Sequence, residues 1–374
     1  AGVSGAKAGW VAMRRPFVAG SHFWAKAMRN GSGLSITCIA CNHACLDHAF
    51  AQKRASCLVN PQACYETELT FLPVDTKKKI AVVGAGPAGL AFSMYAADRG
   101  HEVHLYDKAV EIGGQFNYAK QIPGKEEFYE TLRYFKNQLD RAGVNLHLGV
   151  EAKADTFIDA GFDDVVLATG IKPRQLTIEG HDHPKVMGYL DVLRDHKQVG
   201  EQVAVIGAGG IGFDVAEFLV ENESLTTNKD AWLKHWGIDK TYSNPGALAE
   251  KDITPSQRKV YLLQRRTSKV GKNLGKTTGW IHRQSLKHHN VQMLNGAEYK
   301  RVDDEGLHIV VNEEEKCLPV DNIIVCAGQE PFKPLQQPLE EAGLRVHIIG
   351  GADVAAELDA KRAIRQGAEL AASI

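Results

Sequence analysis

Two stretches of the chain repeat one order of short apolar run, glycine-rich turn and helical pattern. The first begins with the apolar run Lys79–Val83, continues in a helical pattern over 87–99 that stops at a glycine, and leads to a predicted strand over 101–107. The second begins with the run 202–206, and its glycine turn opens a helix over 207–221. This order is typical of βαβ units, so the sequence predicts an α/β protein with two Rossmann-like domains.

The rest of the C-terminal part adds strands to these domains. Apolar runs at 321–328 and 346–350 are predicted strands that end in glycine, and a helical pattern follows over 359–372. We expect the chain to return here to complete the first domain. A polar segment over 223–257 interrupts the second domain as an insertion without an assigned role. Acidic residues bracket an alternating strand within 303–315, which predicts a solvated hairpin.

The N-terminal part shows neither the helical nor the strand pattern of apolar residues. Residues 1–35 are rich in Gly, Ala and Arg and contain no complete strand–helix unit. Cysteines replace hydrophobic periodicity over 35–73, as in a loop region that a metal organises. The first residues include neither an initiator Met nor the apolar run of a secretory signal, so the N-terminus reads as a cut end.

Composition excludes several classes of protein. The 374 residues are 44% hydrophobic and 24% charged, which is typical of a soluble globular protein of two to three domains. Lys and Arg total 44 against 45 Asp and Glu, so no net positive charge favours nucleic acid or an anionic membrane. No stretch approaches the roughly 18 apolar residues of a membrane span. Five of the seven cysteines crowd into 38–64, which favours a reducing compartment, and we expect a cytoplasmic protein.

The first glycine turn, Gly84-Ala-Gly-Pro-Ala-Gly89, has the pattern of a dinucleotide site. Gly84 permits the tight turn, Gly86 leaves room for a pyrophosphate at the helix N-terminus, and Gly89 lets helix and strand pack closely. Asp107 ends the next predicted strand, where a carboxylate can accept hydrogen bonds from ribose hydroxyls. Strand, turn, helix and acid occur in order, so we predict that a dinucleotide binds here.

The second glycine turn, Gly207-Ala-Gly209-Gly-Ile-Gly212, has the same setting but a different partner. The strand that would end in an acid ends instead in Gln264, Arg265 and Arg266. Two guanidinium groups can bind the 2′-phosphate that an acid would repel, so this site is predicted to prefer NADPH over NADH. A solvated basic pair is the alternative interpretation.

Four cysteines have the spacing Cys38-x2-Cys41-x3-Cys45-x11-Cys57. Four thiolates suit a 4Fe-4S cluster or a tetrahedral zinc ion, and the spacing matches neither a paired CxxC zinc knuckle nor the bacterial ferredoxin run. A redox-capable cluster beside two dinucleotide domains would provide an electron path, which favours the cluster. The nearby residues His43, His48 and Cys64 are alternative ligands, and a structural role is favoured for each.

The remaining motifs do not indicate a catalytic or binding site. The segment Gly271–Thr277 lacks the glycine spacing of a phosphate-binding loop, so we exclude an ATPase. Cys317 and Cys326 lie on or beside apolar strands, where we expect buried thiols. No nucleophilic triad can be placed from the sequence, and the catalytic residues are therefore unknown.

With these motifs, the chain resembles the C-terminal half of bacterial NADPH-dependent 2,4-dienoyl-CoA reductases, members of the old yellow enzyme group with extra redox domains. The resemblance covers essentially the full length. The matching segments are Cys38–Cys45, Cys57–Pro61, Glu111–Phe116, Lys120–Lys125, Gly275–Arg283 and Cys326–Pro331.

The resemblance implies cofactors and their residues. The four spaced cysteines would hold a 4Fe-4S cluster, the first Rossmann unit FAD and the second NADPH. Beyond the glycine turn, the residues implied for FAD are Ala88, Asp107, Gln115, Lys125 and Asp353, the last in a segment near the flavin ribityl chain. Arg14 and Arg15 would approach the phosphate of FMN. The two domains would then be glutathione-reductase-like.

The resemblance also divides the chain. The implied parts are 1–35, the tail of an FMN-binding TIM barrel; 36–76, the 4Fe-4S segment; 77–172 with 328–374, the FAD domain; and 173–327, the NADPH domain. Nearly all of the barrel, with the family's catalytic Tyr and His, has no counterpart in this chain. By this resemblance, electrons pass from NADPH through FAD and the cluster to FMN, which reduces a 2,4-dienoyl-CoA thioester in the β-oxidation of unsaturated fatty acids.

Two other interpretations stay open. An iron–sulfur flavoprotein of the trimethylamine dehydrogenase type shares this architecture but sends its electrons to a protein partner. A nucleotide-binding module without turnover, in which the four cysteines hold zinc, is the non-enzymatic alternative.

Overall fold

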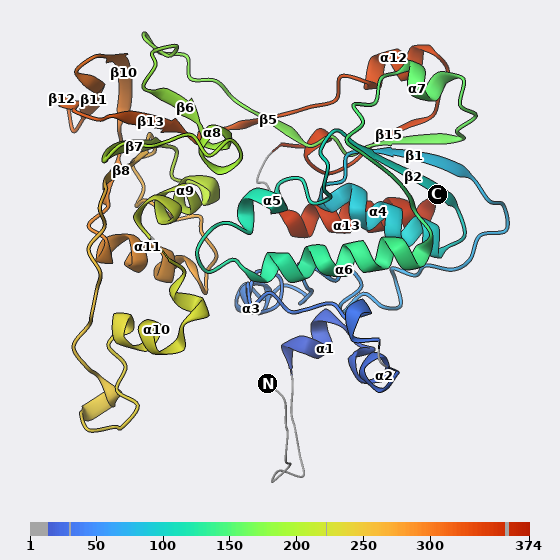
Figure 1. Ribbon diagram of the computed structural model, residues 1–374, viewed down its shortest axis with the longest axis horizontal. Helices are drawn as coiled ribbons and strands as arrows, with labels where there is room; N and C mark the ends of the chain where they lie inside the picture. The colour runs from blue at the N-terminus through green and yellow to red at the C-terminus, as the bar shows by residue number, and fades with distance from the viewer. Residues whose placement is uncertain (1–13, 30, 222, 356–358) are drawn as a thin grey trace.

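The computed structural model describes residues 14–374 except 30, 222 and 356–358. Two α/β units, each built on a parallel sheet of five strands, lie at opposite ends of the molecule (Figure 1). The prediction of an α/β fold with two Rossmann-like units is thereby confirmed. None of the described helices is long and apolar enough to cross a membrane.

The first unit has the strand order β15-β4-β1-β2-β3. Its strands are β1 (Lys79–Val83), β2 (Glu102–Asp107), β3 (Asn145–Leu148), β4 (Asp164–Leu167) and β15 (Val346–Ile348). Its helices are α4 (Pro87–Asp98), α5 (Phe116–Ala119), α6 (Glu127–Ala142), α7 (Asp155–Ile158), α12 (Gln336–Glu341) and α13 (Ala360–Ser373), with a 3₁₀ turn η4 (Gly350–Ala352). The central strands are apolar and buried on both faces, as a parallel sheet covered by helices requires. Helices α13 and α4 pack along each other in this core.

The second unit has the strand order β6-β13-β7-β8-β9. Its strands are β6 (Val186–Gly188), β7 (Gln202–Ile206), β8 (Lys259–Gln264), β9 (Gln292–Asn295) and β13 (Asn322–Val325), and its helices are α8 (Tyr189–Leu193), α9 (Gly210–Val220) and α11 (Gly279–His288). An antiparallel sheet follows, made of β10 (Glu298–Asp303), β11 (Gly306–Val311) and β12 (Glu314–Leu318). The solvated hairpin predicted from the acidic residues is thus confirmed.

One predicted strand belongs to the other sheet. The segment 321–328 was expected to complete the first unit, but β13 pairs with β6 and β7 in the second. The chain returns to the first sheet only with β15, which pairs with β4. Both segments are equally apolar, so the sequence pattern alone does not distinguish which sheet each one joins.

A two-stranded antiparallel ribbon joins the two units. It consists of β5 (Ile171–Pro173), where the chain leaves the first unit, and β14 (Gln329–Pro331), where it returns. The second unit is therefore inserted into the first between these strands.

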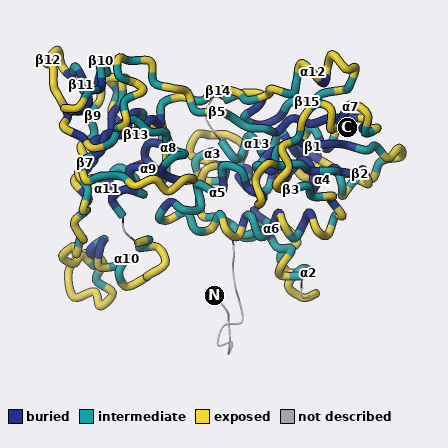
Figure 2. Tube along the Cα trace, turned by 45° about the horizontal axis from the view of Figure 1, so that its top comes forward, coloured by how far each residue is buried: buried dark blue, intermediate teal, exposed yellow. Residues whose placement is uncertain are grey.

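The polar segment predicted as an insertion forms a small subdomain beside the second unit. It contains α10 (Lys229–Trp236) and two 3₁₀ turns, η2 (Leu225–Thr227) and η3 (Pro245–Ala247). The side chain of Asn228 caps α10 by accepting a hydrogen bond from the backbone N–H of Ala231. Figure 2 shows that most of this segment is exposed.

The segment before β1 contains only short helices in its described residues. These are α1 (Arg15–Ala19), α2 (Phe23–Met28), the 3₁₀ turn η1 (Ser32–Leu34) and α3 (Leu46–Phe50). Side chains of the first unit hold this segment: Arg133 donates to the backbone oxygens of Gly33 and Ser35, and Arg365 donates to that of Pro61. Residues 1–13 and 30 of the predicted barrel tail, 1–35, lie outside the described residues.

Candidate functional site

The first glycine turn follows β1, and two of its glycines leave no room for a side chain. Gly84 has a φ of +111°, and a Cβ atom there would lie 2.3 Å from the carbonyl oxygen of Ala168. At Gly89, a Cβ atom would lie 2.0 Å from the carbonyl oxygen of Gly84. Both distances are far inside van der Waals contact, so the tight turn and the close approach of α4 to it both require glycine.

Gly86, by contrast, faces open space. A Cβ atom there would meet nothing within 4 Å. Gly86 is the N-cap of α4, so no side chain satisfies the N–H groups of the first helical turn. By contrast, the N-termini of α10 and α13 are capped by the side chains of Asn228 and Asp359. The N-terminus of α4 is therefore left open to an anionic group such as a pyrophosphate.

Asp107 lies at the end of β2 beside this turn. One of its carboxylate oxygens accepts a hydrogen bond from the backbone N–H of Ala85 at 2.7 Å, and the other accepts one from Ala109 at 2.8 Å. A carboxylate has about four lone-pair positions, so two remain for ribose hydroxyls. Asp107 thus fixes the glycine turn and is also placed to bind a sugar.

The second glycine turn repeats this geometry. Gly207 has a φ of +107°, and a Cβ atom there would lie 2.9 Å from the carbonyl carbon and oxygen of Cys326. At Gly212 a Cβ atom would lie 1.7 Å from the carbonyl oxygen of Gly207, whereas at Gly209 it would meet nothing within 4 Å. Gly209 caps α9 without a side chain. The molecule therefore presents two uncapped helix N-termini of the same construction.

The two turns differ in the residue that follows the neighbouring strand. Arg265 and Arg266 come directly after β8, and both are exposed. Neither guanidinium forms an ion pair with any described residue. Gln264 is held locally, since its amide donates to the backbone oxygens of Arg266 and Ser268. Two free cations thus stand where the first unit has the carboxylate of Asp107.

The segment that contains Asp353 lies against the first turn of α4. A Cβ atom at Gly350 would lie 2.8 Å from the Cβ atom of Ala88, so these two residues are in close contact. The carboxylate of Asp353 accepts a hydrogen bond from Gln366 at 2.8 Å, which fixes its position on α13. Ala88 is therefore in contact with the segment that leads to Asp353, and the FAD role that the resemblance implies for both residues stays a prediction.

Gln115 lies at the junction between the two units. Its side-chain oxygen accepts a hydrogen bond of 3.4 Å from the hydroxyl of Tyr189, at the start of α8. Tyr189 is buried, and burial raises the pKa of its hydroxyl to about 12. The backbone N–H of Gly113 donates to Ala85, so this segment also pairs with the glycine turn. Sequence reasoning missed Tyr189, which carries no motif of its own.

Lys125 also reaches the second unit. Its ammonium lies 2.6 Å from the carboxylate of Asp214 on α9, and both groups are partly buried. The structure thus places Lys125 in an ion pair between the units, and the FAD contact that the resemblance implies for it stays a prediction.

Buried acids lie behind this ion pair, between α9 and α11. Glu217 is buried, and its carboxylate is 2.8 Å from the ring nitrogen Nδ1 of His282. Glu221 accepts a hydrogen bond from Ser285 at 2.7 Å. Burial raises the pKa of Glu221 to about 7, and the negative charge of Glu217 adds to this rise.

The four spaced cysteines line one small cavity. Cys38, Cys41, Cys45 and Cys57 come together there from the segment around α3, and the other walls are mostly apolar. Cys38, Cys41 and Cys57 also pack against the core of the first unit. Cys64, His43 and His48 are not among the residues that line this cavity.

The separation of the sulfur atoms bears on which metal group fits. Zinc–sulfur bonds of about 2.3 Å in a tetrahedron hold the sulfurs about 3.8 Å apart. No three of the four sulfurs, all of which belong to described residues, lie within 4.8 Å of one another. In a 4Fe-4S cluster each cysteine binds a different iron, so its sulfurs stand farther apart than around a single ion. The donor set therefore fits a cluster better than zinc.

The backbone of this loop adopts an uncommon conformation. Ala40 and Asn42 have φ angles of +54° and +58°, a region that non-glycine residues rarely occupy. Together they turn the chain between Cys38 and Cys45. Burial raises the pKa of the Cys41 thiol to about 11 in the absence of a metal, and a bound cation would reverse this preference.

Arg15 lines the same cavity and Arg14 does not, although both residues are exposed. The guanidinium of Arg15 donates to the side-chain oxygen of Asn42 at 3.0 Å. The structure therefore brings Arg15, but not Arg14, to the cysteines.

Asp47 connects the cysteine segment to the second unit. Its carboxylate accepts hydrogen bonds from the backbone N–H of Lys276 at 3.1 Å, and from the N–H and hydroxyl of Thr277 at 2.9 and 2.6 Å. The segment that resembled a phosphate loop thus binds a carboxylate of the protein itself. Sequence reasoning missed Asp47, because its partners are more than two hundred residues away.

Comparisons with known proteins agree with this geometry. The family model of pyridine nucleotide-disulphide oxidoreductases matches residues 78–362. A metal reductase from Desulforamulus reducens is 30% identical over 354 residues, which are 92% of this chain and 52% of that protein. An NADH oxidase from Thermoanaerobacter brockii is 36% identical over 357 residues, with 92% of this chain and 49% of that protein covered. The chain spans about half the length of these curated relatives.

A solved structure shows similarity over nearly the whole chain. The complex of 2-naphthoyl-CoA reductase with 2-naphthoyl-CoA superimposes with a TM-score of 0.82 at 26% identity. The match covers 96% of this chain and 50% of the reductase, so the cysteine segment is included in it.

Proposed function

This chain belongs to the pyridine nucleotide-disulphide oxidoreductase family, and we propose that it is the electron-input part of an NADPH-dependent flavin enzyme of the 2,4-dienoyl-CoA reductase type. Family membership implies FAD and a nicotinamide nucleotide. The fatty-acid pathway, the thioester substrate, the 4Fe-4S cluster, the choice of NADPH and a cytoplasmic location belong to the proposal.

One observation carries the proposal. The molecule has two uncapped, glycine-built helix N-termini, and they differ in the charge beside them: Asp107 at the first, Arg265 and Arg266 at the second. A carboxylate suits the free ribose of FAD, and a guanidinium pair suits the 2′-phosphate of NADPH. A donor and an acceptor of hydride would thus bind in one chain at separate sites.

The residues of this chain have distinct tasks in that reaction. The N–H groups at the start of α4 and α9 bind the two pyrophosphates, and Asp107 orients the flavin's ribose. Tyr189 and Gln115 lie at the junction of the units and exclude water there. FAD, when bound, supplies the ability to take up a hydride and release single electrons, and an iron–sulfur cluster carries one electron at a time.

The cysteine cavity supports the second half of the proposal. Cys38, Cys41, Cys45 and Cys57 would hold the 4Fe-4S cluster, and their segment packs on the core of the first unit. The cluster would therefore lie next to the flavin domain. Arg14 and Arg15 are proposed to meet the phosphate of FMN in the barrel of the complete protein.

An anaerobic titration with NADPH tests the proposal. We expect FAD, iron and sulfide in the purified protein, and bleaching of both the flavin bands and the broad iron–sulfur absorption. Flavin that stays oxidised with excess NADPH would overturn the input role. Bound zinc in a colourless protein would favour the non-enzymatic module. Reduction of a protein acceptor by an amine, without NADPH oxidation, would favour the amine dehydrogenase type.

Nucleotide choice is tested separately, because one similar protein is named an NADH oxidase. Changing Arg265 and Arg266 together to Ala should raise the KM for NADPH at least tenfold and leave the KM for NADH nearly unchanged. The paired change of the exposed residues Lys229 and Lys234 to Ala is the matched control for lost positive charge. Equal losses with both nucleotides would contradict the phosphate-binding role.

A further inference from the structure

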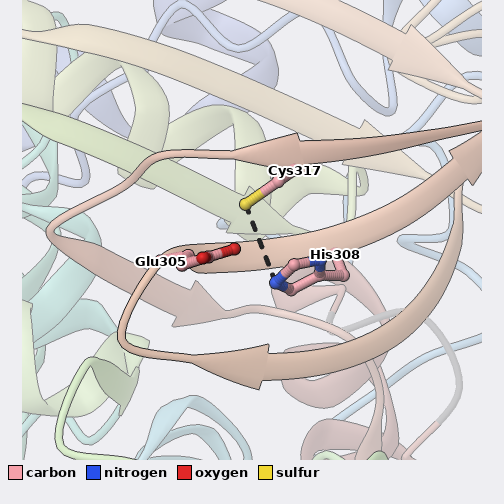
Figure 3. Close-up of side chains that lie close together, drawn as sticks. All are labelled: Glu305, His308 and Cys317. Atoms are coloured by element: carbon pink, nitrogen blue, oxygen red, sulfur yellow. Dashed lines mark hydrogen bonds between the residues drawn. The ribbon is translucent and has the colours of Figure 1, made fainter.

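A second group of metal-ligating side chains lies on the antiparallel sheet of the second unit. His308 on β11 and Cys317 on β12 are directly opposite each other in the strand register. Their Nε2 and Sγ atoms are 3.7 Å apart. Glu305 belongs to the turn between β10 and β11, and Figure 3 shows the three side chains close together on one side of the hairpin.

The ligand atoms of these three residues have the spacing of a preformed metal site. One atom each from Glu305, His308 and Cys317 lies within 4.8 Å of the other two. Cys317 is exposed, contrary to the buried thiol expected from its apolar neighbours, because it points away from the face that buries Leu318. An exposed thiol beside an imidazole and a carboxylate is therefore available to a cation from solvent.

We propose that Glu305, His308 and Cys317 bind one Zn²⁺ ion. Thiolate, imidazole and carboxylate are the three protein ligands that zinc takes, and this mixture is less suited to Mg²⁺ or Ca²⁺, which bind oxygen ligands. The carboxylate of Asp303 is 2.9 Å from the same Nε2 atom of His308, but its oxygens do not lie within 4.8 Å of all three ligand atoms. A water molecule from solvent would complete the tetrahedral coordination that zinc prefers.

Binding moves two protons. The Cys317 thiol releases its proton to solvent when its sulfur binds the ion. In the metal-free protein Nε2 of His308 donates to Asp303, because a carboxylate only accepts. Nε2 must lose this proton to bind zinc, and the neutral ring then carries its proton on Nδ1.

Positive charges near the site oppose the binding of a cation. Arg301 pairs with Asp303, and its Nη2 atom is 3.4 Å from Nδ1 of His308. Lys300 and Lys316 line the adjoining cavity, but each pairs with a glutamate of its own strand. Arg301 is therefore the main charge that opposes zinc binding. It also places a hydrogen-bond donor against Nδ1 of His308, which would carry a proton in the zinc-bound state and would need an acceptor.

The site is separate from the proposed electron path. It lies on β10–β12, at the edge of the molecule far from α3 and the cysteine segment (Figure 1). A zinc ion there would hold the hairpin turn to the β11–β12 strand pair. It would not take part in hydride transfer.

Cobalt and zinc titrations of the full chain with its own cofactors test the proposal. We expect a Co²⁺–thiolate charge-transfer band that Zn²⁺ removes. We also expect one ion bound per chain in addition to any metal in the cavity of the four spaced cysteines. Cys317→Ser should abolish this band and weaken Zn²⁺ at least 10- to 100-fold, since even indirect partners of a ligand cost that much. Cys64→Ser, also an exposed free thiol, is the matched control and should change nothing.

Two further results bear on the ligand set. Arg301→Gln should tighten Zn²⁺ about tenfold, because it removes the opposing charge and gives Nδ1–H an acceptor. An unchanged cobalt band in Cys317→Ser would overturn the proposal. The proposal would also be overturned if Arg301→Gln bound zinc more weakly and the unchanged protein were stabilised against heat by inorganic phosphate but not by Zn²⁺. These results would indicate that the cavity beside Lys300 and Lys316 binds an anion.

Discussion

At the scale of single residues, the seven glycines of the two turns divide into two kinds. Gly84, Gly89, Gly207 and Gly212 are required by the backbone, because a Cβ atom at each would lie 1.7 to 2.9 Å from a backbone atom. Gly86, Gly209 and Gly210 have free space around them, so the fold does not require glycine there. A helix N-terminus without a side chain instead suits the close approach of a ligand.

Alanine substitutions should separate the two kinds. Gly89→Ala should destabilise the protein by about 1–3 kcal/mol or more, because its methyl group overlaps the Gly84 carbonyl. Gly86→Ala should keep the thermal midpoint within a few degrees but weaken FAD about tenfold or more, roughly 1.4 kcal/mol. Thermal unfolding and flavin content measure the two effects. Equal destabilisation by both changes would contradict this division.

The buried acid on the loop after α9 gives a pH-dependent prediction. The pKa of Glu221 is about 7 in the folded protein and 4.5 without burial, so the folded state loses stability as pH rises from about 4.5 to 7. Glu221→Gln keeps an acceptor for Ser285 and should stabilise the protein by about 1–3 kcal/mol at pH 8. At pH 4.5 the two proteins should unfold at the same temperature.

A matched control is the exposed neighbour Glu223, whose change to Gln should alter the thermal midpoint at neither pH. A gain from Glu221→Gln that is as large at pH 4.5 as at pH 8 would show that the carboxyl charge is not its cause.

At the scale of elements, a histidine cluster holds the inserted helix α10. His235 of α10 and His288 at the end of α11 share a hydrogen bond of 3.0 Å, and the ring of His289 lies 5.8 Å from that of His235. Burial lowers the pKa of all three, and together with the charge of the neighbouring Lys251 it lowers that of His288 to about 4. Asp252 is the acid that partly offsets this for His235.

Acid should therefore detach α10. Because these pKa values are lower in the folded protein than in the unfolded segment, the unfolded segment binds protons at a higher pH. The contribution of the cluster to stability is therefore fully present above about pH 6.5 and is lost as pH falls toward 4. Tryptophan fluorescence should report this, since the ring of Trp236 lies 5.2 Å from that of His288. His288→Asn should move the transition to lower pH. If the midpoint pH of this transition is unchanged in His288→Asn, groups other than His288 cause the transition.

The sequence predicts where strands and helices lie along the chain better than it predicts which strands pair in a sheet. The runs 79–83, 202–206 and 259–264 are β1, β7 and β8, because local apolar pattern and glycine turns decide where strands begin and end. Which sheet β13 joins depends on pairing between distant segments, and here the prediction was wrong. The residue-to-cofactor assignments remain predictions that only the loaded protein tests.

The same limit applies to side chains. Cys317 was expected to be buried because its strand lies beside apolar residues, but it is exposed opposite His308, whereas Leu318 is buried opposite Leu307. Asp47 showed no motif, because its function is a contact with Lys276 and Thr277 in the second unit. Contacts of this kind have no local signal in the chain.

At the scale of the whole molecule, Asp47 couples the cysteine segment to the second unit. Asp47→Ala leaves the N–H groups of Lys276 and Thr277 without their acceptor, at a cost of about 1–3 kcal/mol to local stability. Hydrogen exchange over 271–279 should then accelerate at least tenfold. The exposed Asp75, changed to Ala, is the control. Unchanged exchange in Asp47→Ala would show that other contacts hold the units together.

The two-stranded ribbon has a consequence for how the protein is made. The chain leaves the first unit at β5 and returns at β14, yet β15 and α13, which packs along α4, come only after that return. During synthesis on the ribosome the second unit is therefore complete in sequence while the first still lacks a strand and a helix of its core. The nucleotide-binding insert should acquire protease resistance before the domain that surrounds it, and FAD should be captured only when the last helix has left the exit tunnel.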